Sequence, residues 1–111
     1  MDFELYHLIV YVPTKEADAV RKALANAGAG SIGHYDSCSF STHGIGRFRP
    51  DEDAKPAIGA ASHLEEVKEE RIEVVVQHSR LKETLNAVLE VHPYEEPAMH
   101  VVPMLDYRTL L

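Results

Sequence analysis

The sequence has almost no cysteine, with a single residue, Cys38, among 111. One thiol excludes an internal disulfide and is typical of a reducing compartment. The sequence also lacks any uncharged apolar run close to the roughly 20 residues that cross a membrane. The start of the chain, with Asp2 and Glu4 flanking Phe3, lacks the basic residues and apolar core of a signal peptide. We therefore expect a cytoplasmic protein without a membrane partner.

Positive charge is also scarce. The 11 Lys and Arg residues are outnumbered by 18 Asp and Glu residues, which leaves a formal net charge of −7 with neutral histidines. Non-specific binding to nucleic acid depends on neutralising phosphates with basic side chains. Because the basic residues here are few and spread along the chain, we expect no nucleic-acid partner.

Hydrophobic periodicity predicts six main elements. Alternating or β-branched runs indicate strands, and apolar residues three and four positions apart indicate helices. The predicted elements, in order, are a strand at 3–12, a helix at 14–27, a strand at 34–42, a strand at 64–78, a helix at 79–89 and a strand at 98–105. Thr14 and Ser79 are expected to cap the two helices, and Gly28 is expected to end the first. Residues 43–46 contain turn residues, after which 47–49 resume an extended run, so either a hairpin or a bulged continuation of the strand is expected.

This order predicts the architecture. Each helix lies where a crossover between neighbouring strands needs about ten or more residues. The predicted fold class is α+β, a ferredoxin-like βαββαβ domain over residues 1–111, with an antiparallel four-stranded sheet and two helices on one face. Two helices cover only one face, yet the strands at 5–12 and 72–76 read as apolar on both. Self-association is the expected cover for the second face.

The segment HPYEEP at residues 92–97, the proline corner, concentrates polar groups on a stiff backbone. Pro93 and Pro97 fix φ and disfavour helix in the residues before them, so neither a helix nor a central strand runs through it. One interpretation is a rigid connection whose polar side chains bond to backbone or water. The other is a site at a cleft between subunits, with His92, Tyr94 and Glu95 near the predicted strand at 34–42.

Several residues are candidates for binding. His92 and Glu95, three positions apart, together with His100, offer nitrogen and oxygen ligands suited to a divalent metal such as zinc or copper. No paired His-x-x-His pattern accompanies them, so structural contacts remain the alternative. Arg47 and Arg49 flank Phe48 beside the long loop at 51–62 and could bind an anion, or be solvated strand-edge charge.

Five separated motifs point to a known family. In order along the chain they are GHYDSCSFS at 33–41, GIGRFRP at 44–50, PAIG at 56–59, RIE at 71–73 and HPYEEPA at 92–98. Together they resemble the insert domain of the YqfO-type proteins, in the NGG-interacting-factor, GTP-cyclohydrolase-type-II-homologue family. The resemblance covers roughly residues 3–105, and the chain is identified as a stand-alone copy of that insert.

The resemblance implies a fold similar to the PII and CutA proteins, which form trimers with their sheets facing inward. The family's two-metal site lies in a core domain whose segments are not in this sequence, so no catalytic residue is inherited. The implied function is a non-catalytic, homotrimeric binding or regulatory module with a divalent metal or a small molecule at subunit clefts, and with a protein partner left open. We expect the ligand at Tyr35, Arg47, Arg49 and Tyr94. The alternative is a metal-dependent hydrolase or enzyme subunit that uses residues 92–96.

Overall fold

The computed structural model describes residues 3–111, so Met1 and Asp2, part of the acidic start, lie outside the described residues. Its main elements are β1 (Leu5–Pro13), α1 (Ala17–Asn26), β2 (Phe40–Phe48), β3 (Glu65–Gln77), α2 (Leu81–Val91) and β4 (Met99–Met104). Three short 3-10 helices accompany them, η1 (Thr14–Glu16), η2 (His78–Arg80) and η3 (Tyr107–Leu110). Among the residues described, no helix has the length and apolar character to span a membrane.

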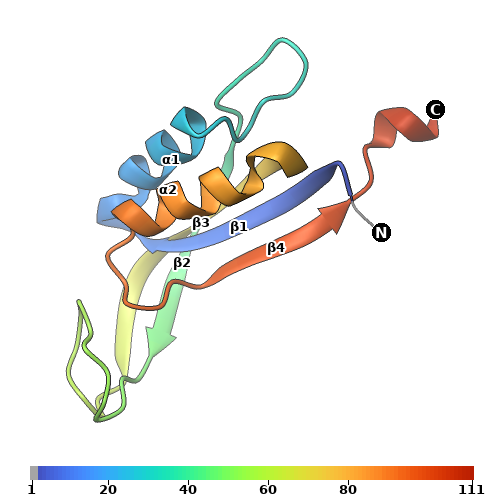
Figure 1. The fold of residues 1–111 in the computed structure, drawn as a ribbon. Coiled ribbons are helices and arrows are strands. Elements are labelled where there is room, and N and C mark those ends of the chain that lie inside the picture. Colours follow the sequence, from blue (N-terminus) through green and yellow to red (C-terminus); the bar gives the residue numbers. More distant parts are fainter. Residues whose placement is uncertain (1–2) are drawn as a thin grey trace.

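The four strands form one sheet in the order β2-β3-β1-β4, and every neighbouring pair is antiparallel. Both helices lie on the same side of this sheet (Figure 1). The predicted α+β, ferredoxin-like arrangement is therefore confirmed.

The core lies between the two helices and the covered face of β1 and β3. Alternate strand residues point to the helices, as the period of two requires. The fully buried apolar side chains include Leu8, Val10, Val12, Val20, Leu24, Ile72, Val76 and Val88. Burial of each of these side chains stabilises the fold by about 1.5–3 kcal/mol. The packing of the two helices therefore stabilises the sheet from its covered face.

The helix starts differ from the prediction, whereas the end of α1 agrees with it. α1 and α2 each begin through a 3-10 turn, and no side chain accepts a capping hydrogen bond at either start, so the predicted caps Thr14 and Ser79 are wrong. At the other end of α1, Gly28 has φ +94°. The Gly28 N–H donates to Ala25 O at 3.0 Å and the next N–H donates to Leu24 O at 3.0 Å. This pattern is the Schellman motif, which ends helices at a glycine.

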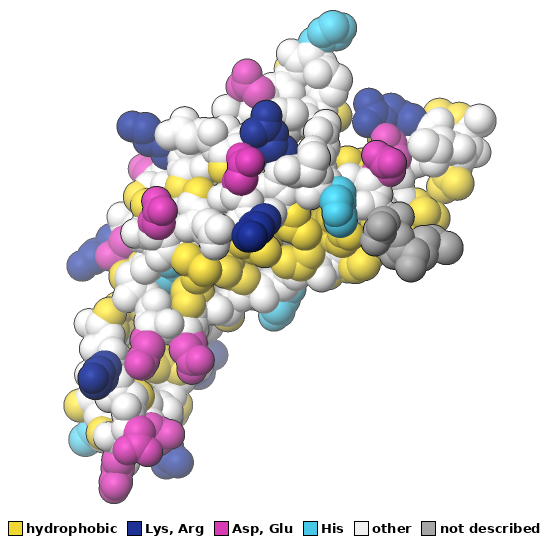
Figure 2. All heavy atoms as spheres, in the orientation of Figure 1, with side chains coloured by type: hydrophobic (Ala, Val, Ile, Leu, Met, Phe, Trp, Pro, Cys, Tyr) yellow, Lys and Arg dark blue, Asp and Glu magenta, His cyan; other side chains and the backbone are white. Residues whose placement is uncertain are grey.

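The second strand is placed wrongly by the sequence. β2 begins at Phe40 and continues through residues 43–46, which read as a turn, while residues 34–39 form a loop. The strand continues because β3 is 13 residues long and supplies partners throughout, with Gly44 opposite Glu69 and Gly46 opposite Val67. β2 and β3 consequently extend as a hairpin well past the helices, and the loop at its tip carries acidic side chains, including exposed Asp51 and Glu52 (Figures 1 and 2).

The uncovered face of the sheet is mixed rather than apolar. Ile9 and Val75 lie on it, but polar residues stand between them. Glu73 Oε1 is 3.1 Å from His7 Nε2 and 3.6 Å from Arg71 Nη2. The expectation of a second apolar face was therefore wrong, because charged residues on this face alternate with the buried residues of the other. Any partner on this face must match its charges as well as its shape.

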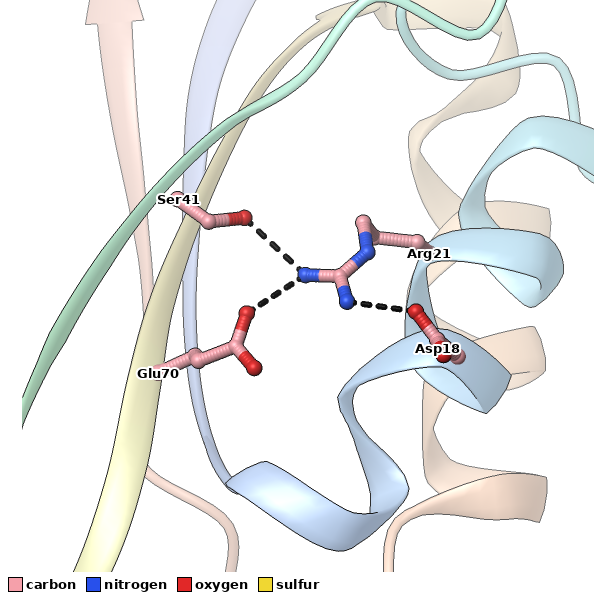
Figure 3. Close-up of polar contacts among 4 residues, drawn as sticks. All are labelled: Asp18, Arg21, Ser41 and Glu70. Carbon is pink, nitrogen blue, oxygen red and sulfur yellow. Dashed lines mark hydrogen bonds and ion pairs between the residues drawn. The ribbon is translucent and has the colours of Figure 1, made fainter.

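Arg21 joins α1 to the sheet. Its Nη1 donates to Glu70 Oε1 at 2.6 Å and to Ser41 Oγ at 3.0 Å, while Nη2 donates to Asp18 Oδ1 at 2.6 Å (Figure 3). The hydrogen bond that Arg21 donates to Asp18, followed by the one it donates to Glu70, raises the pKa of the Arg21 guanidinium above its usual value. Glu70 is 5% exposed, so Arg21 neutralises a carboxylate that burial would otherwise destabilise.

Candidate functional site

A cavity of about 460 Å³ lies where the proline corner crosses the β2–β3 hairpin. Its walls come from residues 46–50 at the end of β2, residues 54–58 of the following loop, and residues 94–100, with Tyr11 and Glu69 contributed by β1 and β3. In Figure 1 the connection from α2 to β4 passes across the hairpin at this level. We call this cavity the corner pocket, and its volume suits a small molecule.

The pocket collects most of the residues singled out by the sequence. The predicted site residues that line it are Arg47, Arg49, Tyr94, Glu95 and His100. Tyr35 and His92 are not among the lining residues. Tyr35 is 75% exposed in the loop before β2, at the other end of that strand. Within one chain the cavity therefore lies beside the end of β2 opposite residues 34–40, and the cleft between subunits near residues 34–40 stays a prediction.

The long loop also contributes to the pocket. The backbone N–H of Lys55 donates to Glu95 Oε1 at 3.0 Å, which ties the loop to the proline corner. Ala54, Pro56 and Ile58 then form one apolar wall. Such a long connection is often functional, and here it closes one side of a cavity.

His92 has a structural role in this geometry. It is 7% exposed, its Nε2 lies 2.7 Å from Tyr11 O, and its Nδ1 accepts the Tyr94 N–H at 3.1 Å. A carbonyl partner requires a proton on Nε2, and an N–H partner requires a lone pair on Nδ1. Both ring nitrogens are thus engaged, and neither is free to bind a metal.

The predicted metal set of His92, Glu95 and His100 is not assembled within one chain. Over residues 3–111, no group of three His, Cys, Asp or Glu side chains is placed to hold a metal ion. The reason is that His92 turns into the fold to hold β1, while Glu95 bonds the loop.

His92→Ala is expected to lower the free energy of unfolding by about 2–3 kcal/mol, because it leaves the Tyr11 carbonyl and the Tyr94 N–H without their partner. Urea denaturation measures this loss. His63→Ala, at an exposed loop position, is the control and should change stability by less than about 0.5 kcal/mol. Equal effects of the two substitutions would contradict the structural role of His92.

Tyr94 and Glu69 form a hydrogen-bonded pair inside the pocket. The Tyr94 hydroxyl donates to Glu69 Oε2 at 2.8 Å, and the Phe48 ring meets Tyr94 edge-on at 5.5 Å between centroids. Burial, followed by the hydrogen bond and negative charge of Glu69, raises the pKa of Tyr94 above its usual value. Tyr94 therefore stays protonated and acts as a donor.

Glu69 was missed by sequence reasoning, which did not include it among the candidate binding residues. One signal was available in the glycines of β2. A Cβ at Gly46 would meet the Glu69 carboxylate, so any other residue there would require the end of the Glu69 side chain to move. A glycine pair inside a strand is a known mark of close approach.

Comparisons with known proteins agree with this fold. No protein-family model matches the chain. The GTP cyclohydrolase 1 type 2 homolog of Bacillus subtilis (strain 168) is 49% identical over 100 residues, which cover 90% of this chain and 27% of that protein. The corresponding protein of Halalkalibacterium halodurans is 44% identical over 102 residues, covering 92% of the chain and 27% of its own length. This chain is homologous to one segment of the GTP cyclohydrolase 1 type 2 homologs.

Solved structures extend the relationship. The Bacillus cereus protein related to NIF3 superposes with a TM-score of 0.81 at 40% identity, over 94% of this chain and 26% of that one. The matching segment of the Bacillus cereus protein thus has the same fold as this chain. This chain spans about a quarter of the length of these relatives. CutA from Synechococcus elongatus PCC7942 shares the fold alone, with a TM-score of 0.68 at 19% identity over 99% of this chain and 88% of its own.

Proposed function

We propose that this chain is a non-catalytic binding or regulatory module, acting as one domain, that holds a small ligand in the corner pocket. The observation that carries the proposal is the assembly of the pocket from three distant segments: the end of β2, the long loop and the proline corner. Arg47, Arg49 and Tyr94 supply its charged and polar contacts. A few polar groups around a largely apolar cavity are typical of small-molecule sites.

The same proposal places the module in a homotrimer. Ile9 and Val75 lie on a sheet face that no helix within residues 3–111 covers, beside the ion pair of His7 with Glu73. A neighbouring subunit would shield the apolar residues and complement the charges. The structural similarity to CutA supports this face as a contact surface. The corner pocket lies at one end of the same face, where Tyr11, Glu69 and His100 of a single chain line it.

A catalytic role for the proline corner has less support. The hydrolase alternative needs a group within residues 92–96 that is free to act as a base or to bind a metal. His92 is occupied at both ring nitrogens, and Tyr94 is a protonated donor. Glu95 and Glu96 are left as candidates, and Glu95 bonds the loop backbone.

A thermal-shift screen of nucleotides, amino acids, amines, carboxylic acids and divalent ions tests the binding function. At least one compound is expected to raise the melting temperature, with its affinity then measured by calorimetry. Arg49→Ala and Phe48→Ala should each weaken that binding by about tenfold, since each removes a wall or a charge of the pocket.

The control is Arg80→Ala, an exposed arginine of η2 that does not line the pocket. It should leave the affinity unchanged, and light scattering should report the same mass, expected to be three chains, for every variant. If no compound in the screen binds, or if both pocket variants bind as well as the parent, the proposed function is wrong.

A further inference from the structure

We propose that the corner pocket takes a ligand that carries a protonated amine, and that Glu69 is the counter-ion of that amine. The inference rests on the proposed binding function and specifies which chemical group the pocket selects. It follows from a buried carboxylate, the aromatic rings around it, and the way the neighbouring charges are already used.

Glu69 is a buried charge without a cation. It is 8% exposed and lines the cavity, and within residues 3–111 no Lys, Arg or His forms a salt bridge with it. Its hydrogen bond comes from the neutral Tyr94 hydroxyl. Glu70, the next residue, is buried to the same degree but on the covered face, where Arg21 pairs with it at 2.6 Å. Buried carboxylates are normally paired, so the pocket side of β3 lacks the cation that the helix side has.

The rings around Glu69 favour a cation over water. Phe48 and Tyr94 line the same cavity, together with Tyr11, whose ring already has the Arg71 guanidinium 5.8 Å from its centroid. An aromatic face is negative and attracts a cation, and groups of such faces recognise ammonium ligands. The Tyr94 hydroxyl is directed to Glu69 Oε2, so Tyr94 orients the carboxylate while its ring contributes to the wall.

The cations at the rim do not neutralise Glu69. Arg47 Nε instead lies 3.3 Å from Glu66 Oε1, and Arg49 lines the pocket with an exposed side chain. Two further carboxylates, Glu95 and Glu96, also line the cavity. Glu95 and Glu96 are exposed, so the negative charge in the buried part of the pocket comes from Glu69 alone. The two arginines are placed to meet an acidic group at the other end of an amine-bearing ligand.

Matched probes test the amine directly. 2-Phenylethylamine and its neutral counterpart 2-phenylethanol differ in the one group that Glu69 would bind. At neutral pH the amine is expected to bind at least about tenfold more tightly than the alcohol, as measured by calorimetry or by ligand-detected NMR.

Glu69→Gln is the deciding variant, because it removes the charge and keeps an acceptor for Tyr94. It should reduce the preference for the amine to about twofold or less and leave the alcohol affinity unchanged within about twofold. Phe48→Leu, which removes one aromatic face, should weaken amine binding about threefold or more. Glu90→Gln, on the exposed side of α2, is the charge-matched control and should change neither affinity.

The outcomes separate this inference from the proposed function. If other compounds bind in the pocket but the amine shows no advantage over the alcohol, or if Glu69→Gln keeps that advantage, the amine inference is overturned and the binding function stands. If amine binding is lost in Arg49→Ala but kept in Glu69→Gln, then Arg49 and not Glu69 holds the ligand, and the inference is again wrong. If no compound binds at all, both proposals fail.

Discussion

Gly30→Ala is expected to lower the free energy of unfolding by about 3–5 kcal/mol, a large effect for a loop substitution, because Gly30 is buried. Gly30 has φ +80°, which strains any other residue. A Cβ there would also run into the backbone O and N of Cys38. These atoms cannot move aside as a flexible side chain could, because the Cys38 N–H donates to Gly30 O at 2.9 Å and the Gly30 N–H to Val75 O at 2.8 Å.

Gly33→Ala separates the two causes. Gly33 also has positive φ, +58°, but a Cβ at this position meets nothing within 4 Å. Its cost should be about 1 kcal/mol, from backbone conformation alone. Urea denaturation of both variants gives the comparison, and equal losses would mean that the contact between Gly30 and Cys38 does not constrain the fold.

Arg21→Met is expected to lower the free energy of unfolding by about 2–3 kcal/mol, because it leaves the Glu70 carboxylate buried without its cation. The loss should stay below that of a fully buried pair, since the Arg21 side chain is 30% exposed and water can reach the site. Methionine keeps most of the packing of the arginine stem, so the change in stability reports mainly on charge.

The double variant Arg21→Met/Glu70→Gln tests that explanation. Removing the unpaired charge should restore at least half of the lost stability. Arg80→Met is the matched control, because its pairing with Glu83 is solvent-exposed on both sides, and it should cost less than about 0.5 kcal/mol. If the double variant is no more stable than Arg21→Met, the lost contacts to Asp18 or Ser41 are the cause instead.

The proline corner shows how far residue spacing can mislead. His92 and Glu95, three residues apart, suggested a metal site, yet His92 bonds to Tyr11, 81 positions earlier in the chain. Nothing within the corner specifies that partner. The direction of the His92 ring depends on how β1 passes beneath the corner, which is a property of the assembled sheet.

Local signals in the sequence determined most of the secondary structure and the fold. The strand patterns of β1, β3 and β4, the helical stripes of α1 and α2, and the stop at Gly28 each arise from residues a few positions apart, where periodicity and backbone preference act. Their order then leaves few ways to arrange the chain. The positions of the long loop and of the proline corner, outside any helix or strand, were predictable for the same reason.

Tertiary structure alone decided the extent of β2 and the composition of the pocket. Residues 43–46 have the composition of a turn, and only pairing with the long β3 makes them strand. Glu69 belongs to an acidic run that resembles a solvated face, and it is buried because Tyr94 and Gly46 come together over it. Such contacts join residues more than twenty positions apart, and their energies depend on burial and register, which no local pattern encodes.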